Sequence, residues 1–203
     1  MTRVVADITI SLDGFVTGPD AGPENGLGTG GRPLHTWAFS DDPGDQRFLQ
    51  QGMERSGAVV MGRHLFDVVD GPGGWNDEVG YGAGEVGRPP FVVVTSEPPA
   101  SVRLSELDWT FVTTGLADAI AVARDRVEAA PATGRERDVV LMGGGALIGS
   151  ALAAGLVDEL SLHIAPLLLG AGTPIFVAGP PRALVQRAAV VTSTATHLTY
   201  DVL

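Results

Sequence analysis

Three consecutive glycines, Gly143, Gly144 and Gly145, lie where an apolar run gives way to a helical pattern. Residues 139–142 are continuously apolar, as in a strand that is covered on both faces. Apolar residues return at helical spacing over residues 146–152. Glycine lets the backbone turn sharply at such a junction. The first N–H groups of the helix, with the positive end of its dipole, can then bind a phosphate group. The turn predicts a phosphate site, and a tight connection without a ligand is the alternative.

Two other expected strand ends carry groups suited to anions. The tripeptide Gly62-Arg63-His64 follows a buried run at residues 57–61, and Thr95-Ser96 follows another at residues 91–94. In open α/β sheets, ligands gather outside the carboxyl ends of the strands. The three turns together therefore predict a ligand with more than one phosphate. A guanidinium beside two hydroxyls suits a ribose 2′-phosphate, which favours NADP over NAD.

A Rossmann dinucleotide fold is the first alternative for the glycine turn. Its fingerprint has glycine at the first, third and sixth positions. Gly143 and Gly145 match the first two, but Ile148 takes the sixth. The turn also lies late in the chain instead of in the first strand–helix unit. We therefore do not favour this fold, and an NAD-preferring dehydrogenase is kept only as a competing function.

The composition limits the function classes further. A chain of 203 residues with a hydrophobic fraction of 44% predicts a single domain over residues 1–203. No apolar run approaches the roughly 20 residues that cross a bilayer, and the net charge of −11 argues against nucleic acid and anionic membranes as partners. The absence of cysteine and lysine excludes thiol chemistry, Schiff bases on lysine and a Walker-type loop. We expect a cytoplasmic protein with no metal site.

The elements that must position these turns can be read from the apolar periodicity. We expect strands at residues 3–12, 57–61, 91–94, 109–113, 139–142 and 159–168, and a C-terminal hairpin of residues 184–191 and 198–202. Helices are expected at residues 42–55, 65–69, 116–130 and 146–152, and long glycine-rich loops at residues 18–33 and 71–90. This order predicts an α/β fold with a mainly parallel sheet flanked by helices and an antiparallel C-terminal hairpin.

The ordered set of motifs resembles the dihydrofolate reductase-like superfamily. Residues 61–66 (MGRHLF), the Thr95-Ser96 strand end and residues 142–147 (MGGGAL) occur in the order seen in those proteins. Residues 155–170 (GLVDELSLHIAPLLLG) and residues 11–14 (SLDG) look like the C-terminal reductase domain of riboflavin biosynthesis, the RibD C-terminal type. The resemblance spans nearly the whole chain.

This resemblance implies an NADPH-dependent reductase that acts as a homodimer on a small-molecule substrate. The matching enzyme is 5-amino-6-(5-phosphoribosylamino)uracil reductase, and a small heterocyclic or sugar-linked substrate would accept the hydride. Dihydrofolate reduction and a nucleotide-binding module without turnover are the alternatives. The resemblance places the following residues at NADPH: Thr9 and Val16 beside the nicotinamide, Gly62, Arg63 and His64 at the phosphates, Thr95 and Ser96 at the 2′-phosphate end, and Met142, Gly143, Gly144, Gly145, Ala146 and Leu147 at the pyrophosphate.

Four residues are candidates for the substrate side of the site. Asp13 closes the strand that faces the nicotinamide in this fold, so it is a candidate catalytic group, and a plain Asp-Gly turn is the alternative. His163 would project near the substrate pocket by the same resemblance, and a structural histidine is its alternative. His35 and Trp37 end the first long loop and are candidates for the pocket wall.

Other polar residues are assigned structural roles. His197 alternates with Thr199 and opposes Leu198, which predicts that it lies on a solvated face of the last strand. Asp41 or Asp42 is expected to cap the helix that begins at Pro43. Capping also accounts for the acidic residues there, Asp41, Asp42 and Asp45, without a metal, because their spacing fits no calcium loop.

Overall fold

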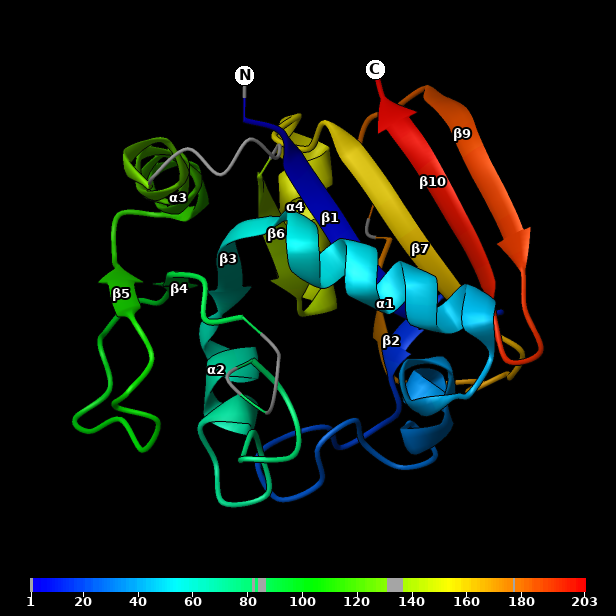
Figure 1. Ribbon diagram of the computed structural model, residues 1–203, viewed down its shortest axis with the longest axis horizontal. Coiled ribbons are helices and arrows are strands. Elements are labelled where there is room, and N and C mark those ends of the chain that lie inside the picture. Colours follow the sequence, from blue (N-terminus) through cyan, green and yellow to red (C-terminus); the bar gives the residue numbers. More distant parts are fainter. Residues whose placement is uncertain (1, 82, 84–86, 131–136, 177) are drawn as a thin grey trace.

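An eight-stranded sheet forms the centre of the computed structural model, which describes residues 2–81, 83, 87–130, 137–176 and 178–203 (Figure 1). The strands lie in the order β5-β4-β3-β6-β1-β7-β10-β9. The neighbours from β5 to β7 are parallel, β10 is antiparallel to β7, and β9 is antiparallel to β10. The strands are β1 (Val4–Ser11), β3 (Ser56–Gly62), β4 (Phe91–Val94), β5 (Trp109–Val112), β6 (Asp138–Gly143), β7 (Glu159–Ala165), β9 (Leu184–Val191) and β10 (Thr196–Val202).

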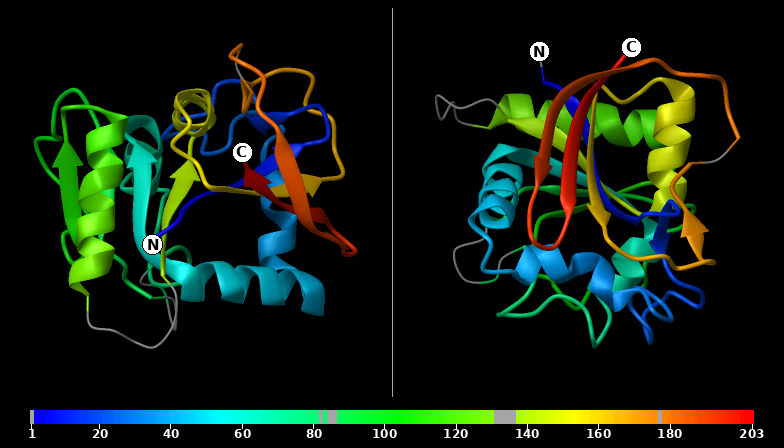
Figure 2. Two further views of the ribbon diagram at one scale, coloured as in Figure 1. Left: turned by 90° about the horizontal axis from the view of Figure 1, so that it is seen from above. Right: turned by 90° about the vertical axis from the view of Figure 1, so that its right-hand side faces the viewer.

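This arrangement confirms the expected α/β fold with a mainly parallel sheet and an antiparallel C-terminal hairpin, in its dihydrofolate reductase-like form. The order differs from the 3-2-1-4-5-6 order of a Rossmann sheet, because β1 lies between β6 and β7. Figure 2 shows the β9–β10 hairpin at the outer edge of the sheet. A small second sheet pairs β2 (Phe15–Thr17) with β8 (Thr173–Pro174).

Helices cover both faces of the large sheet (Figures 1 and 2). The structure has α1 (Pro43–Arg55), α2 (Arg63–Val69), α3 (Leu116–Ala129), α4 (Gly145–Ala154) and a 3-10 helix, η1 (Arg32–Phe39). α3 and α4 pack on one face, whereas α1 and α2 lie on the other, with α1 crossing the sheet in front of β1 and β7. Among the described helices, none is both long and apolar enough to span a bilayer.

The first helix begins as its sequence predicts. Asp42 is the N-cap and accepts a hydrogen bond from the Gly44 N–H at 2.8 Å, and Pro43 occupies the first helical position. At the other end, Arg55 donates to Asp138 at 2.8 Å and to Glu159 at 3.0 Å. These ion pairs fasten the last turn of α1 to the amino ends of β6 and β7.

The two faces of the sheet differ in polarity. Under α3 and α4 the side chains form a continuous apolar cluster that includes Ile8, Val60 and Leu141. On the opposite face, the half under α2 is also apolar. The half under α1 is lined with polar side chains at every second position of three strands: Asp7, Thr9 and Ser11 of β1; Glu159, Ser161 and His163 of β7; and His197, Thr199 and Asp201 of β10. A polar inner face of this kind is a candidate site.

Candidate functional site

The glycine turn lies at the carboxyl end of β6 and begins α4. A Cβ atom added to Gly145 would lie 2.8 Å from Val16 Cγ2 and 2.9 Å from the Pro174 carbonyl oxygen, so only glycine fits there. A Cβ added to Gly144 would have no atom within 4 Å. The Gly143–Gly144 peptide bond is cis. Gly144 therefore faces open space, whereas the next residue, Gly145, is packed tightly against β2 and β8.

The turn at Arg63 lies directly beside the glycine turn. A Cβ added to Gly62 would be 3.7 Å from Leu147 Cδ1, and one added to Gly143 would be 3.6 Å from Leu65 Cδ2. The two strand ends therefore share side-chain contacts. This proximity follows from the parallel pairing of β3 with β6.

Arg63 also joins the third turn. Its Nη1 donates to the Glu97 carbonyl oxygen at 2.8 Å, and its Nε donates to Asp67 at 2.7 Å. The Thr95 hydroxyl donates to the same Glu97 carbonyl at 2.7 Å. Ser96 is exposed, and its hydroxyl forms no hydrogen bond within the described part of the chain. The three turns thus meet along one edge, and the Thr95 hydroxyl uses its proton inside its own turn.

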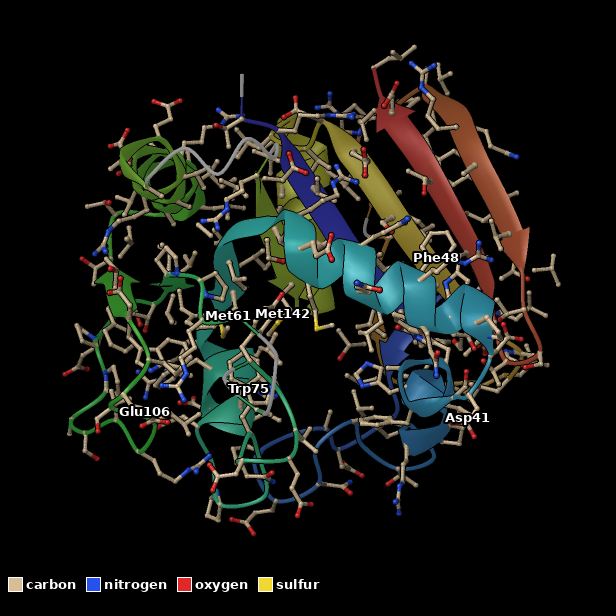
Figure 3. The ribbon with its side chains drawn as sticks, viewed as in Figure 1. Asp41, Phe48, Met61, Trp75, Glu106 and Met142 are labelled. Atoms are coloured by element: carbon tan, nitrogen blue, oxygen red, sulfur yellow. The ribbon has the colours of Figure 1, made fainter. Side chains whose placement is uncertain are left out.

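The remaining residues expected at the cofactor surround this edge. Figure 3 shows Met142 next to Met61 at the ends of β6 and β3, below α1. His64 and Ala146 are exposed, and Leu147 is partly buried. A Cβ added to Gly22, in the first long loop, would lie 3.9 Å from His64 Cε1. The assignment of these residues to NADPH stays a prediction.

A pocket opens beside this edge under α1. It is lined by Asp7, Trp37, Phe48, Leu49, Gly52, Met53, Ser56, Tyr81, Val140, Met142 and His163. Met142 connects the pocket to the glycine turn, since it immediately precedes Gly143. Trp37 is buried and its indole Nε1–H donates to the Thr9 hydroxyl at 2.9 Å. Trp37 therefore lies in the wall of this pocket, whereas the neighbouring His35 is exposed, and the assignment of both residues to a substrate pocket stays a prediction.

A chain of four titratable side chains leads from the pocket into the interior. Asp7 Oδ1 lies 3.0 Å from His163 Nε2, and His163 Nδ1 lies 2.6 Å from His197 Nδ1. His197 Nε2 lies 2.7 Å from Asp45 Oδ1. The Asp7 side chain is 33% exposed, whereas those of His163, His197 and Asp45 are 3%, 0% and 0% exposed. Only Asp7 therefore offers this chain a contact with solvent or a ligand.

Aromatic rings and hydroxyls fix the chain in place. The Trp37 ring lies 4.2 Å from that of His163, and the Phe48 ring stacks on that of His197 at 4.4 Å between centroids. Ser40 and Thr194 each donate a hydroxyl to Asp45 Oδ2 at 2.5 Å.

The same surroundings set the pKa values of the two innermost groups. Burial alone would raise the pKa of Asp45, but hydrogen bonds from hydroxyls and from His197 outweigh it and lower the pKa from 3.8 to about 2. The pKa of His197 is lowered mainly by burial, with the nearby His163 adding to the effect. The buried end of this hydrogen-bonded set of side chains thus holds the ionised carboxylate of Asp45 next to the neutral imidazole of His197.

Two predictions about single residues change with the structure. His197 is wrongly predicted to lie on a solvated face, because β10 pairs with β7 and α1 covers that side of both strands. Asp45 is not explained by capping: it is fully buried and binds His197. The alternation of polar side chains on β10 fits a solvated and a buried face equally, so no sequence signal identifies His197 as buried, and none singles out Asp45 of α1.

Asp13 lies in the exposed turn after β1. Its two carboxylate oxygens accept the N–H groups of Leu169 and Gly170, at 3.1 and 2.7 Å. A hydrogen bond from Ser11 and these backbone donors lower the pKa of Asp13 to about 2. The contacts favour a role in holding the loop after β7, and a catalytic role for Asp13 stays a prediction.

Comparison with known proteins places the chain in a family. The sequence profile described as the RibD C-terminal domain matches residues 2–199. The chain belongs to the RibD C-terminal domain family. The match confirms the resemblance seen in the sequence motifs.

Individual relatives of this RibD C-terminal domain are distant. The chain is 24% identical over 177 residues to the uncharacterised protein YyaP of Bacillus subtilis (strain 168), covering 86% of this chain and 80% of YyaP. It superposes on a putative riboflavin biosynthesis protein from Shewanella sp. PV-4 with a TM-score of 0.70 and 22% identity, covering 100% and 99% of the two chains. It superposes on Acinetobacter baumannii RibD with a TM-score of 0.68 and 17% identity, spanning 58% of that chain. These structures share the fold.

Proposed function

We propose that this RibD C-terminal domain is an NADPH-dependent reductase that transfers a hydride to a small heterocyclic or sugar-linked substrate. The observation that carries the proposal is the meeting of the Arg63, Thr95 and glycine turns at one edge of the sheet, beside a pocket with a polar wall. Family membership supports the class of reaction.

The residues at this edge fit a dinucleotide with an additional phosphate. Gly144 faces open space, and the N–H groups of Gly145 and Ala146 at the start of α4 have no partner within the described residues. These donors can bind a pyrophosphate. The Arg63 side chain is 38% exposed beside the Thr95 turn, and its Nη2, which has no partner among the described residues, can donate to a 2′-phosphate. NADPH supplies the hydride, and the protein orients it and excludes water.

The pocket supports a planar substrate. Trp37 and Phe48 provide aromatic surfaces, while Asp7, which is bonded to His163, provides a polar group on one wall. A heterocyclic ring would pack against these two aromatic side chains, and its polar edge would bind Asp7. The phosphoribosylamino-pyrimidine of riboflavin biosynthesis and dihydrofolate both fit this description, so both are candidate substrates.

The cofactor assignment is tested with Arg63→Ala. We expect the Kd for NADPH, measured by quenching of tryptophan fluorescence, to rise roughly 10- to 100-fold, since one charge-assisted phosphate contact contributes about 1.5–3 kcal/mol. The Kd for NADH should stay unchanged. Arg126→Ala on α3 is the matched control, because its side chain is 42% exposed and also ion-paired. Equal weakening of NADPH and NADH by Arg63→Ala would refute the 2′-phosphate assignment.

The reaction is tested by NADPH oxidation at 340 nm with the two candidate substrates in separate assays. Turnover with either supports a reductase and selects the substrate class. Tight NADPH binding without turnover of either would instead support the alternative, a nucleotide-binding module of the same fold. Tighter NADH than NADPH binding would support the dehydrogenase alternative.

We also propose that the chain forms a homodimer through the free edge of β9. Leu184, Val185 and Val191 on this edge strand are 43%, 38% and 79% exposed. Exposed apolar edge strands are rarely left unpaired in solution. Light scattering behind size-exclusion chromatography should give twice the chain mass, and Val185→Lys should give the monomer mass. A monomeric wild type would refute this proposal.

A further inference from the structure

The hydrogen-bonded chain from Asp45 to Asp7 constrains where its protons lie. Each of its three contacts, at 2.7, 2.6 and 3.0 Å, joins two atoms that can both accept, so each needs one proton between them. Asp45 has its other oxygen filled by two hydroxyl donors, which favours the ionised form. His197 must therefore donate from Nε2 to Asp45.

The positions of the remaining protons follow from the proton on His197 Nε2. A neutral His197 that donates from Nε2 can only accept at Nδ1, so His163 must donate from Nδ1. His163 Nε2 then faces Asp7 Oδ1 across 3.0 Å. One more proton belongs in this contact, either on the imidazole or on the carboxyl group. Both states carry the same total charge, so the proton can move between the two atoms without a change in the charge of the site.

Asp7 is the member of this couple that reaches the pocket. A Cβ added to Gly52 of α1 would lie 3.8 Å from Asp7 Oδ2. Glycine in a helix interior costs roughly 1 kcal/mol relative to alanine, yet this position leaves room beside the free carboxylate oxygen. Gly52 and Met142 line the same pocket as Asp7. The free oxygen therefore faces a space that continues to the glycine turn.

The other charged and titratable groups around Asp7 have partners of their own. Tyr81, whose pKa is raised mainly by burial, shares a hydrogen bond with Ser56 at 3.0 Å. Arg55 on α1 is bound to Asp138 and Glu159, on the far side of Asp7 from Met142. The groups that face the couple are Tyr81, Arg55 of α1, Asp138 of β6, Glu159 of β7, His197 of β10 with Asp45 behind it, and His35 of η1. The pKa of His35 is lowered by the atoms packed around its ring and by His163, which favours a neutral imidazole there. The second oxygen of Asp7 is thus left to a ligand.

We propose that Asp7 is the proton donor of the reduction, that it shares its proton with His163, and that His197 and Asp45 are positioning residues. This inference rests on the proposed function. A C=N or C=O carbon of the substrate accepts the hydride, and the π electrons move to the nitrogen or oxygen. That atom takes one proton from the Asp7–His163 couple through the Asp7 carboxyl group, which leaves the Asp7 carboxylate beside a neutral His163. NADP⁺ is the oxidised product, and the couple recovers a proton from water through the exposed side of Asp7.

The positioning role has a physical basis. His197 accepts the Nδ1–H of His163 and so fixes both the tautomer and the ring plane of His163. This hydrogen bond keeps the Nδ1 proton of His163 in place, so the shared proton can lie only at Nε2 or on Asp7. Asp45 fixes His197 in the same way.

The first test needs no cofactor. In ¹⁵N-histidine NMR of the wild type, Nε2 of His163 should keep its proton to a higher pH than in Asp7→Asn. His197→Leu, which cannot accept the Nδ1–H, should lower the pH of this transition. If the latter variant does not fold, His197→Phe, which keeps the ring volume beside Phe48 but also cannot accept the Nδ1–H, gives the same readout. Identical titration of His163 in the wild type and Asp7→Asn would overturn the shared proton.

The second test is turnover with 5-amino-6-(5-phosphoribosylamino)uracil and with dihydrofolate. Asp7→Asn should lower kcat by about 100-fold or more, as for loss of a general acid, while the Kd for NADPH stays within about twofold. Asp7→Glu should restore part of kcat, and Asp125→Asn, an exposed carboxylate on α3, should leave it unchanged. Wild-type kcat in Asp7→Asn would overturn the donor role alone. A wild type that binds no NADPH, or reduces neither compound, would refute the proposed function and the donor role together.

Discussion

Replacing Asp45 by alanine should destabilise the protein strongly although the residue lies in the first turn of a helix. Its carboxylate is fully buried and accepts from three donors, the hydroxyls of Ser40 and Thr194 and the Nε2–H of His197. Alanine leaves all three without their acceptor. A buried donor without a partner costs about 1–3 kcal/mol, and the hydroxyls can turn elsewhere whereas the imidazole cannot. We expect a loss of about 3–5 kcal/mol in the free energy of unfolding.

Asparagine at the same position separates the charge from the hydrogen bonds. Its oxygen can still accept from His197, so the expected loss at pH 7 is only about 1–2 kcal/mol. The ionised Asp45 has its pKa lowered from 3.8 to about 2, which corresponds to roughly 2 kcal/mol of stability. Because the folded pKa lies below the unfolded one, this stability is present above about pH 4 and is lost as the pH falls toward 2. Asp45→Asn should lack that part of the acid destabilisation.

Urea unfolding followed by circular dichroism provides the assay, at pH 7 and then at lower pH. Asp41→Ala is the matched control, since Asp41 is exposed just before the same helix, away from the pocket (Figure 3). Its unfolding midpoint should change little. If Asp45→Ala cost no more than Asp41→Ala, the buried network would not hold α1 on the sheet, and the reasoning above would be wrong.

Three further predictions follow from the site. Gly145→Ala should lower the free energy of unfolding by about 1–3 kcal/mol, because its Cβ would lie 2.8 Å from Val16; thermal unfolding measures this, and an unchanged Tm would contradict the tight turn. Gly144→Ala should keep the wild-type Tm but weaken NADPH binding, because its Cβ would enter only open space; unchanged NADPH affinity would place the cofactor elsewhere. The lowered pKa of His197 means that stability is fully present above its ordinary value of 6.5 and declines as the pH falls below that. Urea unfolding between pH 7 and 5 should show this decline, and His197→Asn should flatten it; an equal slope in both would refute the assignment.

Strands and helices could be predicted from the sequence wherever the apolar pattern of a short segment was enough to define them. The run at residues 91–94 is strand β4 as expected, because all of its side chains pack between helical layers. The helix from Pro43 was marked by its own capping residue, Asp42. η1 was not expected as a helix, because proline and glycine around it give no helical periodicity.

The meeting of the three turns was also predictable, because parallel strands bring their carboxyl ends to one edge. The hydrogen-bond partner of each donor at these turns was not predictable. Thr95 was expected to offer its hydroxyl to a phosphate, yet the hydroxyl donates to the Glu97 carbonyl two residues on. Short polar side chains often bond to nearby backbone in this way, and the choice depends on turn geometry that the sequence does not specify.

The buried hydrogen-bonded set of four residues is the main feature that could not be predicted from the sequence. Asp7, Asp45, His163 and His197 come from four elements, and the hydrogen-bonded partners Asp7 and His163 are 156 residues apart in the sequence. The alternation around His197 is the same as that of a solvated edge strand. Only the tertiary position of α1, which covers β7 and β10, makes that face interior.

The unequal faces of the sheet have a consequence for engineering. The apolar layer beneath α3 and α4 lies on the opposite side of the strands from the pocket wall that Asp7 and His163 line. Substitutions at Val60, Ala123 or Ile148 of that layer should therefore change the free energy of unfolding without changing the side chains that line the pocket. Libraries that seek new substrates can vary the pocket residues under α1 while this apolar layer is left unchanged.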